Sequence, residues 1–249
     1  MASVLDGRSV VVTGASSGIG AAVTRALAAE GARLTIGARR AARLERLAEE
    51  IGVDRVTVVK TDMRVEGDVV RLIAAARERF GGVDALVNNA GLGRRAPVSS
   101  APTELWREML ETNVLGLLIA TREAVQDMER RKSGGHVVQV SSMAGHRVPG
   151  PDSGMYAATK FAVRALTEAL RQELRTRKSA IRVSAISPGH VFTEFADVFS
   201  GRPGSAAEID RRSKILEPQD VADAILFVVT RPPHVQVHDV LMRPTGQRN

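Results

Sequence analysis

Short apolar runs alternate with longer amphipathic stretches along the whole chain of 249 residues. Runs that are apolar nearly throughout and rich in β-branched residues predict strands buried on both faces, at residues 9–13, 33–37, 56–60, 85–88, 137–141 and 182–186. A helical period between these runs predicts helices over residues 18–30, 41–51, 66–80, 103–132 and 154–177. A helix over 218–229 and a strand near 240–242 close the pattern.

The regular strand–helix alternation predicts an α/β fold, a doubly wound parallel sheet with helices on both faces. No low-complexity linker or internal repeat divides the chain, so we expect residues 1–249 to form a single domain. The exception to the pattern is residues 192–214, which contain Gly201, Pro203 and Gly204 and show no clear period. Long irregular segments in compact domains are often lids. We therefore expect this segment, called the flap below, to be mobile and to cover the substrate.

Composition narrows the class of protein. Apolar residues make up 44% and charged residues 25%, as in ordinary globular proteins. No apolar run approaches the roughly 20 residues of a membrane helix, and the N-terminus lacks a signal-peptide pattern, so we expect a cytoplasmic protein without a membrane partner. The absence of cysteine excludes disulfides and thiolate catalysis. The five histidines show no zinc-like pairing, so we expect no metal.

The net charge of +7 raises the alternative of a nucleic-acid-binding protein. The positive residues are scattered among 28 carboxylates, and aromatic residues, which would stack on bases, are only 3% of the chain. We therefore expect no nucleic-acid partner.

A glycine-rich turn follows the first predicted strand. Residues 10–13 lead into Gly14-Ala15-Ser16-Ser17-Gly18-Ile19-Gly20 and then into an alanine-rich helix. A turn of this kind places backbone N–H groups and a helix N-terminus at one point, where a pyrophosphate binds. Gly14 permits the tight turn, Gly18 a close approach of the ligand, and Gly20 close contact between helix and strand. The sequence therefore predicts a nucleotide site here.

The spacing G-x-x-x-G-x-G resembles the first motif of the short-chain dehydrogenase/reductase family, T-G-x-x-x-G-I-G, which residues 13–20 match in full. Further family motifs follow in order, at Asp62, residues 88–91, Asn113, Ser142, Tyr156 with Lys160, and Pro188-Gly189. The resemblance implies a Rossmann-type sheet of about seven strands in the order 3-2-1-4-5-6-7. It also implies a nicotinamide cofactor and assembly into a homotetramer or a dimer.

Charge at the end of the second strand bears on the choice of cofactor. Enzymes that select NAD usually place a carboxylate there for the ribose 2′-OH, but this chain has Ala38 followed by Arg39 and Arg40. Arg39 can pair with a 2′-phosphate in a bidentate manner. Arg40 either assists or begins the solvated face of the next helix. The sequence therefore predicts NADP(H).

The resemblance also assigns the rest of the cofactor groove. It places Asp62 near the adenine, makes Asn88, Ala90 and Gly91 line the groove, and lets Val191 and Thr193 meet the nicotinamide amide. The full expected set of cofactor-binding residues is Gly14, Ser16, Ser17, Gly18, Ile19, Gly20, Arg39, Arg40, Asp62, Met63, Asn89, Ala90, Gly91, Tyr156, Lys160, Pro188, Gly189, Val191 and Thr193.

Tyr156, the chain's only tyrosine, lies four residues before Lys160. On a helix these side chains share a face. A free phenol has a pKa of about 10, and a nearby ammonium lowers it, which suits proton transfer at neutral pH. The resemblance assigns Tyr156 the acid/base role and gives Lys160 the additional task of binding the nicotinamide ribose.

Two further residues complete the expected catalytic set. Ser142, at the end of the fifth predicted strand, can hydrogen-bond the substrate oxygen where charge develops, while its neighbour Ser141 points to the opposite face. The Ser142–Tyr156 interval is one residue longer than in many family members. Asn113 matches the family's helical asparagine, whose implied task is to hold a water linking Lys160 to solvent.

The sequence thus predicts an NADP(H)-dependent oxidoreductase that transfers a hydride between the nicotinamide and a small carbonyl or alcohol. Residues 218–247 are similar to members acting on small aldehydes, ketones or hydroxy acids, among them the clavulaldehyde-type dehydrogenases and the 3-hydroxy-acid dehydrogenase group. The alternative is a non-catalytic NADP-binding sensor of the same fold.

Overall fold

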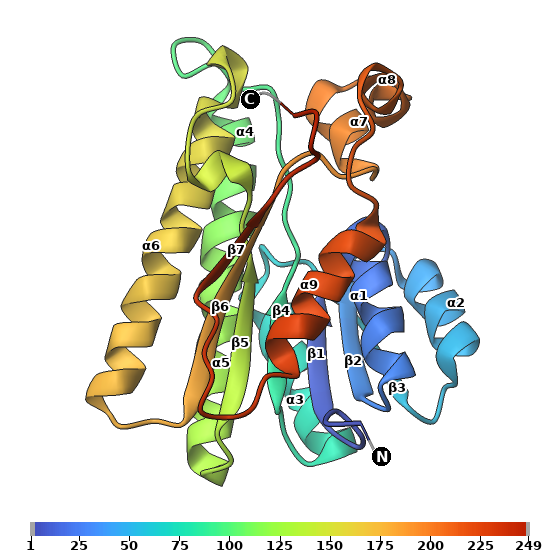
Figure 1. The fold of residues 1–249 in the computed structure, drawn as a ribbon, viewed down its shortest axis with the longest axis vertical. Coiled ribbons are helices and arrows are strands. Elements are labelled where there is room, and N and C mark those ends of the chain that lie inside the picture. Colours follow the sequence, from blue (N-terminus) through green and yellow to red (C-terminus); the bar gives the residue numbers. More distant parts are fainter. Residues whose placement is uncertain (1–2, 248–249) are drawn as a thin grey trace.

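The computed structural model describes residues 3–247 and contains one parallel sheet (Figure 1). Its seven strands follow the order β3-β2-β1-β4-β5-β6-β7, which confirms the predicted Rossmann-type topology. The strands are β1 Ser9–Thr13, β2 Arg33–Ala38, β3 Val56–Lys60, β4 Ala85–Asn88, β5 Gly135–Val140, β6 Ile181–Pro188 and β7 Asp239–Met242.

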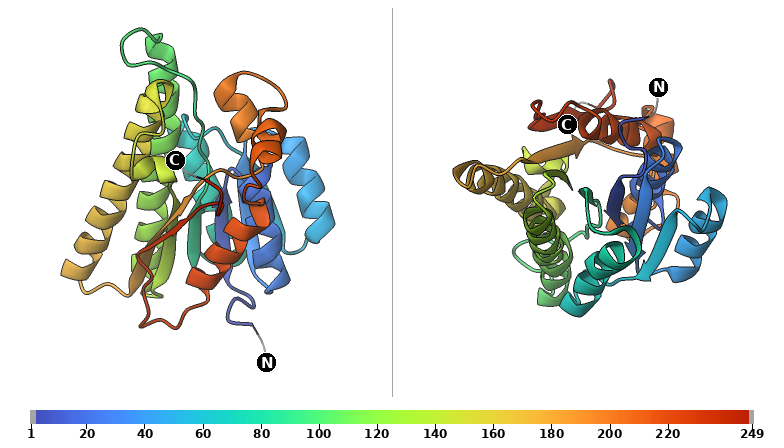
Figure 2. Two further views of the ribbon diagram at one scale, coloured as in Figure 1. Left: turned by 45° about the horizontal axis from the view of Figure 1, so that its top comes forward. Right: turned by 90° about the horizontal axis from the view of Figure 1, so that it is seen from below.

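Helices cover both faces of this sheet (Figure 2). Helices α1, α2 and α9 pack on one face and helices α3, α5 and α6 on the other. None of the described helices is long and apolar enough to cross a membrane. The helices are α1 Gly18–Ala29, α2 Ala41–Ile51, α3 Glu66–Phe80, α4 Thr103–Leu110, α5 Gly116–Arg131, α6 Gly154–Thr176, α7 Phe195–Ser200, α8 Ser205–Arg212 and α9 Pro218–Val229.

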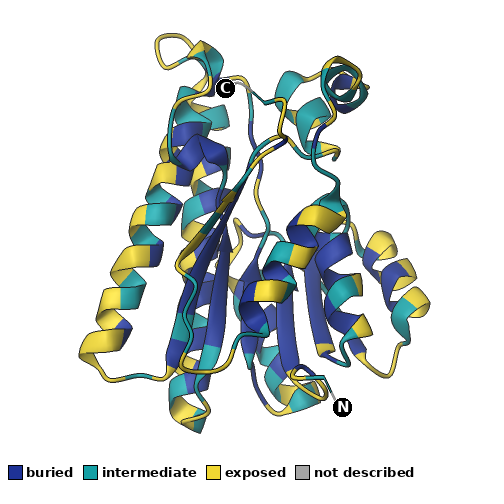
Figure 3. Ribbon diagram, in the orientation of Figure 1, coloured by how far each residue is buried: buried dark blue, intermediate teal, exposed yellow. Residues whose placement is uncertain are grey.

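The central strands are buried on both faces (Figure 3). In β1, the side chains of Val10 and Val12 enter the apolar cluster under α1 and α9, while that of Val11 enters the cluster under α3 and α5. Successive side chains of a strand point to opposite faces, so a strand covered on both sides is apolar at most of its positions. This tendency explains why the short apolar runs predicted the strands correctly.

The long helix predicted over residues 103–132 is interrupted. A five-residue π-helix, Glu111–Leu115, separates α4 from α5. Gly116, the first residue of α5, packs so closely against the carbonyl of Met63 that a β-carbon there would overlap it. The interruption is local, and sequence periodicity does not reveal it, because a single wider turn shifts the apolar positions by only one residue.

The expectation that the flap is irregular is wrong, because it contains the two short helices α7 and α8. Gly201, with φ +69°, and Gly204, with φ +81°, separate them. Both glycines have left-handed backbone conformations, which L-residues with side chains rarely adopt. Each helix is too short to show a clear 3.6-residue period in the sequence.

Candidate active site

A cavity of about 800 Å³ lies at the carboxyl edge of the sheet. The turn after β1, the ends of β2, β4, β5 and β6, and the flap contribute to its wall. In doubly wound sheets, ligands bind at this edge, where the strand order reverses. The reversal in this protein falls between β1 and β4, directly beneath the glycine turn.

The glycine turn is built for close contacts. A β-carbon on Gly14 would lie 2.8 Å from the Cα of Ala90, and one on Gly20 would overlap the Gly14 carbonyl. The Asn89 side-chain amide donates to the carbonyl oxygens of Thr13, at 3.0 Å, and Gly14, at 3.2 Å, and so holds the turn against the loop after β4. Ser17 precedes α1 without capping it through its side chain. The backbone N–H groups at this helix end therefore suit an anionic ligand, and the turn fits a pyrophosphate.

The two arginines after β2 differ in their surroundings. Arg39 forms no hydrogen bond or ion pair with another described residue, and it lies close enough to Asp62 to contribute to the lowered pKa of that carboxyl. The hydrogen bond from Arg64 is the larger cause of that lowering. Arg40 donates to the hydroxyls of Ser16, at 3.2 Å, and Ser17, at 2.6 Å. Of these two arginines, Arg39 is thus the one whose guanidinium is uncommitted.

Helix α6 is hydrogen-bonded to the end of β5 through Lys160. The Lys160 ammonium donates to the Val140 carbonyl at 2.9 Å, and its nitrogen lies 5.9 Å from the centre of the Tyr156 ring. The Ser141 hydroxyl donates to the Lys160 carbonyl at 3.2 Å, so Ser141 is bound to α6, and both Ser141 and Ser142 line the cavity. Lys160 is only 4% exposed. The two adjacent serines therefore have different partners, since Ser141 is hydrogen-bonded to the Lys160 carbonyl and Ser142 to the Tyr156 side chain.

Burial governs the ionisation of this pair. Burial raises the pKa of Tyr156 to about 12, and a hydrogen bond with Ser142 acts in the opposite direction. Burial also lowers the pKa of Lys160 to about 8. Both shifts favour the neutral forms, because removal from water disfavours charge. A ligand that brings a second positive charge next to the phenol would favour its phenolate.

The lowered pKa of Lys160 predicts how stability depends on pH. The folded-state pKa is about 8 and the ordinary value is 10.5, so between them the unfolded chain binds more protons. The free energy of unfolding of the cofactor-free protein should therefore rise with pH across this window. Relative to Lys160→Met, the wild type should gain up to about 3 kcal/mol between pH 7.5 and 10.

Urea unfolding of both proteins at the two pH values measures this gain. The exposed Lys132 supplies the control, because Lys132→Met removes the same charge without a buried ammonium. An equal pH dependence of the unfolding free energy for all three proteins would show that folding does not lower the pKa of Lys160.

Asn113 lies in the π-helix and is 1% exposed. Its side-chain oxygen accepts from the Leu92 N–H at 2.8 Å, and its nitrogen donates to the Leu92 carbonyl at 2.8 Å and to Thr159 Oγ1 at 3.0 Å. The side chain thus joins the loop after β4 to α6. Its expected role in a water-linked proton path stays a prediction.

Most of the predicted cofactor-binding residues lie around this one cavity. Asn88 does not, because its buried amide donates to Thr121 Oγ1 at 2.9 Å in the interior. The residues that do line the cavity are Gly14, Ser16, Ser17, Gly18, Ile19, Gly20, Arg39, Arg40, Asp62, Met63, Asn89, Ala90, Gly91, Ser142, Tyr156, Lys160, Pro188, Gly189, Val191 and Thr193. No group of histidines, aspartates and glutamates among residues 3–247 could hold a metal ion.

An aromatic cluster lines the cavity beside Tyr156, and its phenylalanines are not among the site residues predicted from the sequence. The Tyr156 ring lies 5.3 Å from that of Phe195 and 6.0 Å from that of Phe199, measured between centroids. Gly93 permits this arrangement, because a β-carbon there would lie 2.8 Å from both phenylalanine rings. The i, i+4 spacing of the two phenylalanines was the available signal. They contribute an apolar part of the cavity wall.

The sheet is doubly wound and parallel, and at its carboxyl edge a glycine turn suited to a phosphate lies beside a serine, a tyrosine and a lysine. This combination defines a Rossmann-type oxidoreductase. The short chain dehydrogenase family matches residues 8–201. The chain belongs to this family, and the protein is a short-chain dehydrogenase/reductase enzyme.

Individual relatives match over nearly the full chain. Dehydrogenase/reductase SDR family member 11 of Bos taurus is 46% identical over 247 residues, covering 96% of this chain and 97% of the relative. Farnesol dehydrogenase of Aedes aegypti is 41% identical over 247 residues, covering 97% and 98%. Among solved structures, the closed form of a serine dehydrogenase complexed with NADP+ superposes with a TM-score of 0.89 at 34% identity, covering 97% of this chain and 96% of that chain.

Proposed function

We propose that this enzyme transfers a hydride between NADP(H) and a small carbonyl or alcohol, with Tyr156 as the acid/base. One observation carries the proposal. Ser142, Tyr156 and Lys160 line the same cavity as the glycine turn and the uncommitted Arg39. Binding of a dinucleotide and proton transfer to a substrate oxygen are thereby possible in one continuous space.

NADP(H) is the proposed cofactor. Ala38 ends β2 where an NAD-selective enzyme would place a carboxylate, and the free guanidinium of Arg39 follows it. A guanidinium can hold a phosphate through two parallel hydrogen bonds. Two of the similar solved structures, the serine dehydrogenase and a metagenomic short-chain oxidoreductase, were determined with NADP.

The proposed chemistry divides between cofactor and protein. The bound nicotinamide supplies or accepts the hydride. The Tyr156 hydroxyl gives its proton to the substrate oxygen during reduction and takes it back during oxidation. Ser142 donates a hydrogen bond to the same oxygen, where negative charge develops. Lys160 lies on the same helical face as Tyr156, so its ammonium, when protonated, would favour the phenolate and oppose the burial that raises the phenol's pKa.

The substrate is proposed to be small, of the aldehyde, ketone or hydroxy-acid type. The similarity of residues 218–247 to clavulaldehyde-type and 3-hydroxy-acid dehydrogenases supports this choice, as does the likeness to a serine dehydrogenase. The rings of Phe195 and Phe199 next to Tyr156 offer an apolar surface for the carbon skeleton of the substrate.

Purified protein should oxidise NADPH in the presence of a suitable carbonyl, and its NADPH-linked kcat/KM should exceed the NADH-linked value. Absorbance at the nicotinamide band, recorded over a panel of small aldehydes, ketones, hydroxy acids and polyols with both cofactors, measures this. Tight NADPH binding without turnover across the panel would contradict the proposal and favour the non-catalytic sensor.

Self-association is a further part of the proposal. Four apolar side chains on α4, the π-helix, α5 and α6 expose 37% to 52% of their surface. They are, in that order, Leu110, Leu115, Leu118 and Phe161. Clustered apolar side chains on a protein surface commonly mark an interface. They support the prediction of a homotetramer or a dimer.

A further inference from the structure

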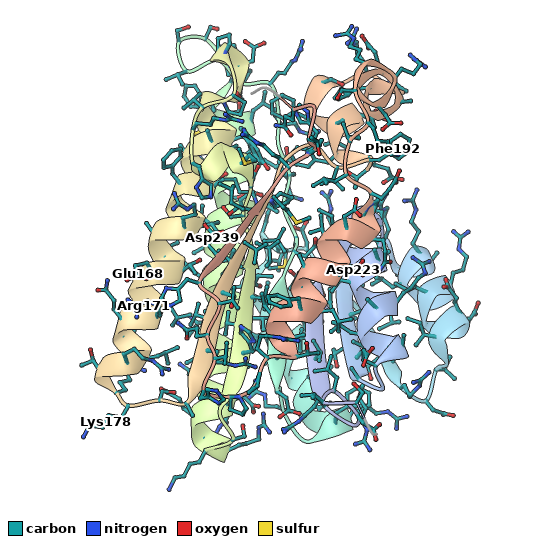
Figure 4. The ribbon with its side chains drawn as sticks, viewed as in Figure 1. Glu168, Arg171, Lys178, Phe192, Asp223 and Asp239 are labelled. Carbon is teal, nitrogen blue, oxygen red and sulfur yellow. The ribbon has the colours of Figure 1, made fainter. Side chains whose placement is uncertain are left out.

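The first residues of the flap touch the cofactor side of the cavity. The chain leaves the sheet after β6 and passes Phe192, which is labelled in Figure 4. The next residue, Thr193, lies over the glycine turn, where a β-carbon on Gly18 would come within 2.8 Å of its Cγ2. The flap therefore begins directly on the expected pyrophosphate site.

Glu194 joins the flap to the arginines that follow β2. Its carboxylate accepts hydrogen bonds from the guanidinium groups of Arg40 and Arg43, each at 2.7 Å. These two bonds lower the pKa of Glu194 to about 2. Arg40 also donates to Ser16 and Ser17 of the glycine turn. Arg40 therefore links the flap to the glycine turn, and it lies next to Arg39, the residue proposed to bind the cofactor's ribose phosphate.

Helix α7, which follows Glu194, forms part of the substrate side of the cavity. Phe195 and Phe199 pack on Tyr156, and the Phe199 carbonyl accepts from the Arg95 N–H at 3.2 Å. The Arg94 guanidinium donates to the Val198 carbonyl, also at 3.2 Å. Helix α7, with only six residues, thus has Glu194 at its N-terminal end and the aromatic wall of the pocket on its body.

We propose that Glu194 is a positioning residue, whose ion pairs with Arg40 and Arg43 hold the flap closed so that Phe195 and Phe199 stand against Tyr156 and complete the substrate pocket. This inference rests on the proposed function. A helix this short moves as a unit, so the position of Glu194, the residue just before α7, determines where the rings of Phe195 and Phe199 lie. The cofactor end of the cavity thereby sets the shape of the substrate end.

Arg43 offers the cleaner partner for a test. Among the described residues the Arg43 guanidinium hydrogen-bonds to Glu194 alone, whereas Arg40 also holds two serines of the glycine turn. Arg46 offers the matched control, because it lies on the same helix, is exposed, and donates to the carbonyl of Ala42 in its own helix. Arg46→Gln removes the same charge from α2 and touches no contact of the flap.

The flap contains trypsin sites at Arg211, Arg212 and Lys214. Glu194→Gln and Arg43→Gln should each increase the rate of tryptic cleavage there about fivefold, the effect of losing an exposed ion pair. Both variants should raise KM for the carbonyl substrate by a similar factor and leave kcat within about twofold. The double variant should resemble Glu194→Gln, because that substitution already removes the ion pair with Arg43.

Arg46→Gln should behave as wild type. High salt should accelerate cleavage of the wild type but not of Glu194→Gln, because screening weakens exposed ion pairs. Wild-type cleavage rates in Glu194→Gln, equal effects from Arg46→Gln, or additive effects in the double variant would overturn the inference. Proteolysis needs no substrate, so a failure of turnover would refute the proposed function and leave this test intact.

Discussion

Tyr156→Phe is expected to lower kcat by about a thousandfold, because a positioned acid/base group contributes roughly 10²–10⁴ to the rate. The substitution removes only the hydroxyl that exchanges a proton with the substrate oxygen. The ring contacts with Phe195 and Phe199 are kept, so the pocket retains its shape. Lys160 keeps its hydrogen bond to the Val140 carbonyl, which is independent of the phenol.

Single-turnover oxidation of bound NADPH, followed by absorbance, measures the loss directly. Two controls separate chemistry from folding: the affinity for NADPH should stay within about twofold, and the midpoint of urea unfolding should change little. Turnover in Tyr156→Phe close to that of the wild type would show that another group transfers the proton. Ser142, whose side chain is hydrogen-bonded to Tyr156, would then be the first candidate.

The double substitution Ala38→Asp with Arg39→Ser should invert the cofactor preference, moving the ratio of NADPH-linked to NADH-linked kcat/KM by about 10² to 10³ toward NADH. Each charge-assisted hydrogen bond contributes roughly 1.5 to 3 kcal/mol. The substitution removes those of Arg39 to a 2′-phosphate and adds those of a carboxylate to a ribose 2′-OH. Ala38 and Arg39 both line the cavity.

Steady-state kinetics with both cofactors and one substrate measures this ratio. Arg39→Ser alone is the informative companion, because it should weaken the use of NADPH without improving that of NADH. An unchanged ratio in both variants would show that Arg39 is not the phosphate ligand. Arg40 is already bound to Ser16, Ser17 and Glu194, so it should not replace Arg39 without releasing the flap.

The amino-acid sequence determined the features that depend on local chemistry. Strands buried on both faces are apolar at most positions, so the runs that form β1 and β4 were recognisable at their true bounds. The glycine turn has local reasons for residues without a β-carbon, since Gly14 has a φ of +69° and Gly20 lies against the Gly14 carbonyl. The spacing of Tyr156 and Lys160 on one helical face is likewise a property of four consecutive peptide units.

The tertiary structure decided which polar groups meet. Neighbours in sequence separated there, since Asn88 turned into the interior while Asn89 came to hold the glycine turn. The π-helix around Asn113 also followed from packing, and it brought that side chain onto Leu92 and Thr159.

The arginines show this division most clearly. Sequence placed Arg39 and Arg40 side by side as candidate phosphate ligands, but only the fold distinguished them, by bringing Glu194 from more than 150 positions away onto Arg40. Such a contact depends on the path of the whole chain between the two residues. No local pattern encodes that path, because the distance between distant residues is set by how the intervening strands and helices pack.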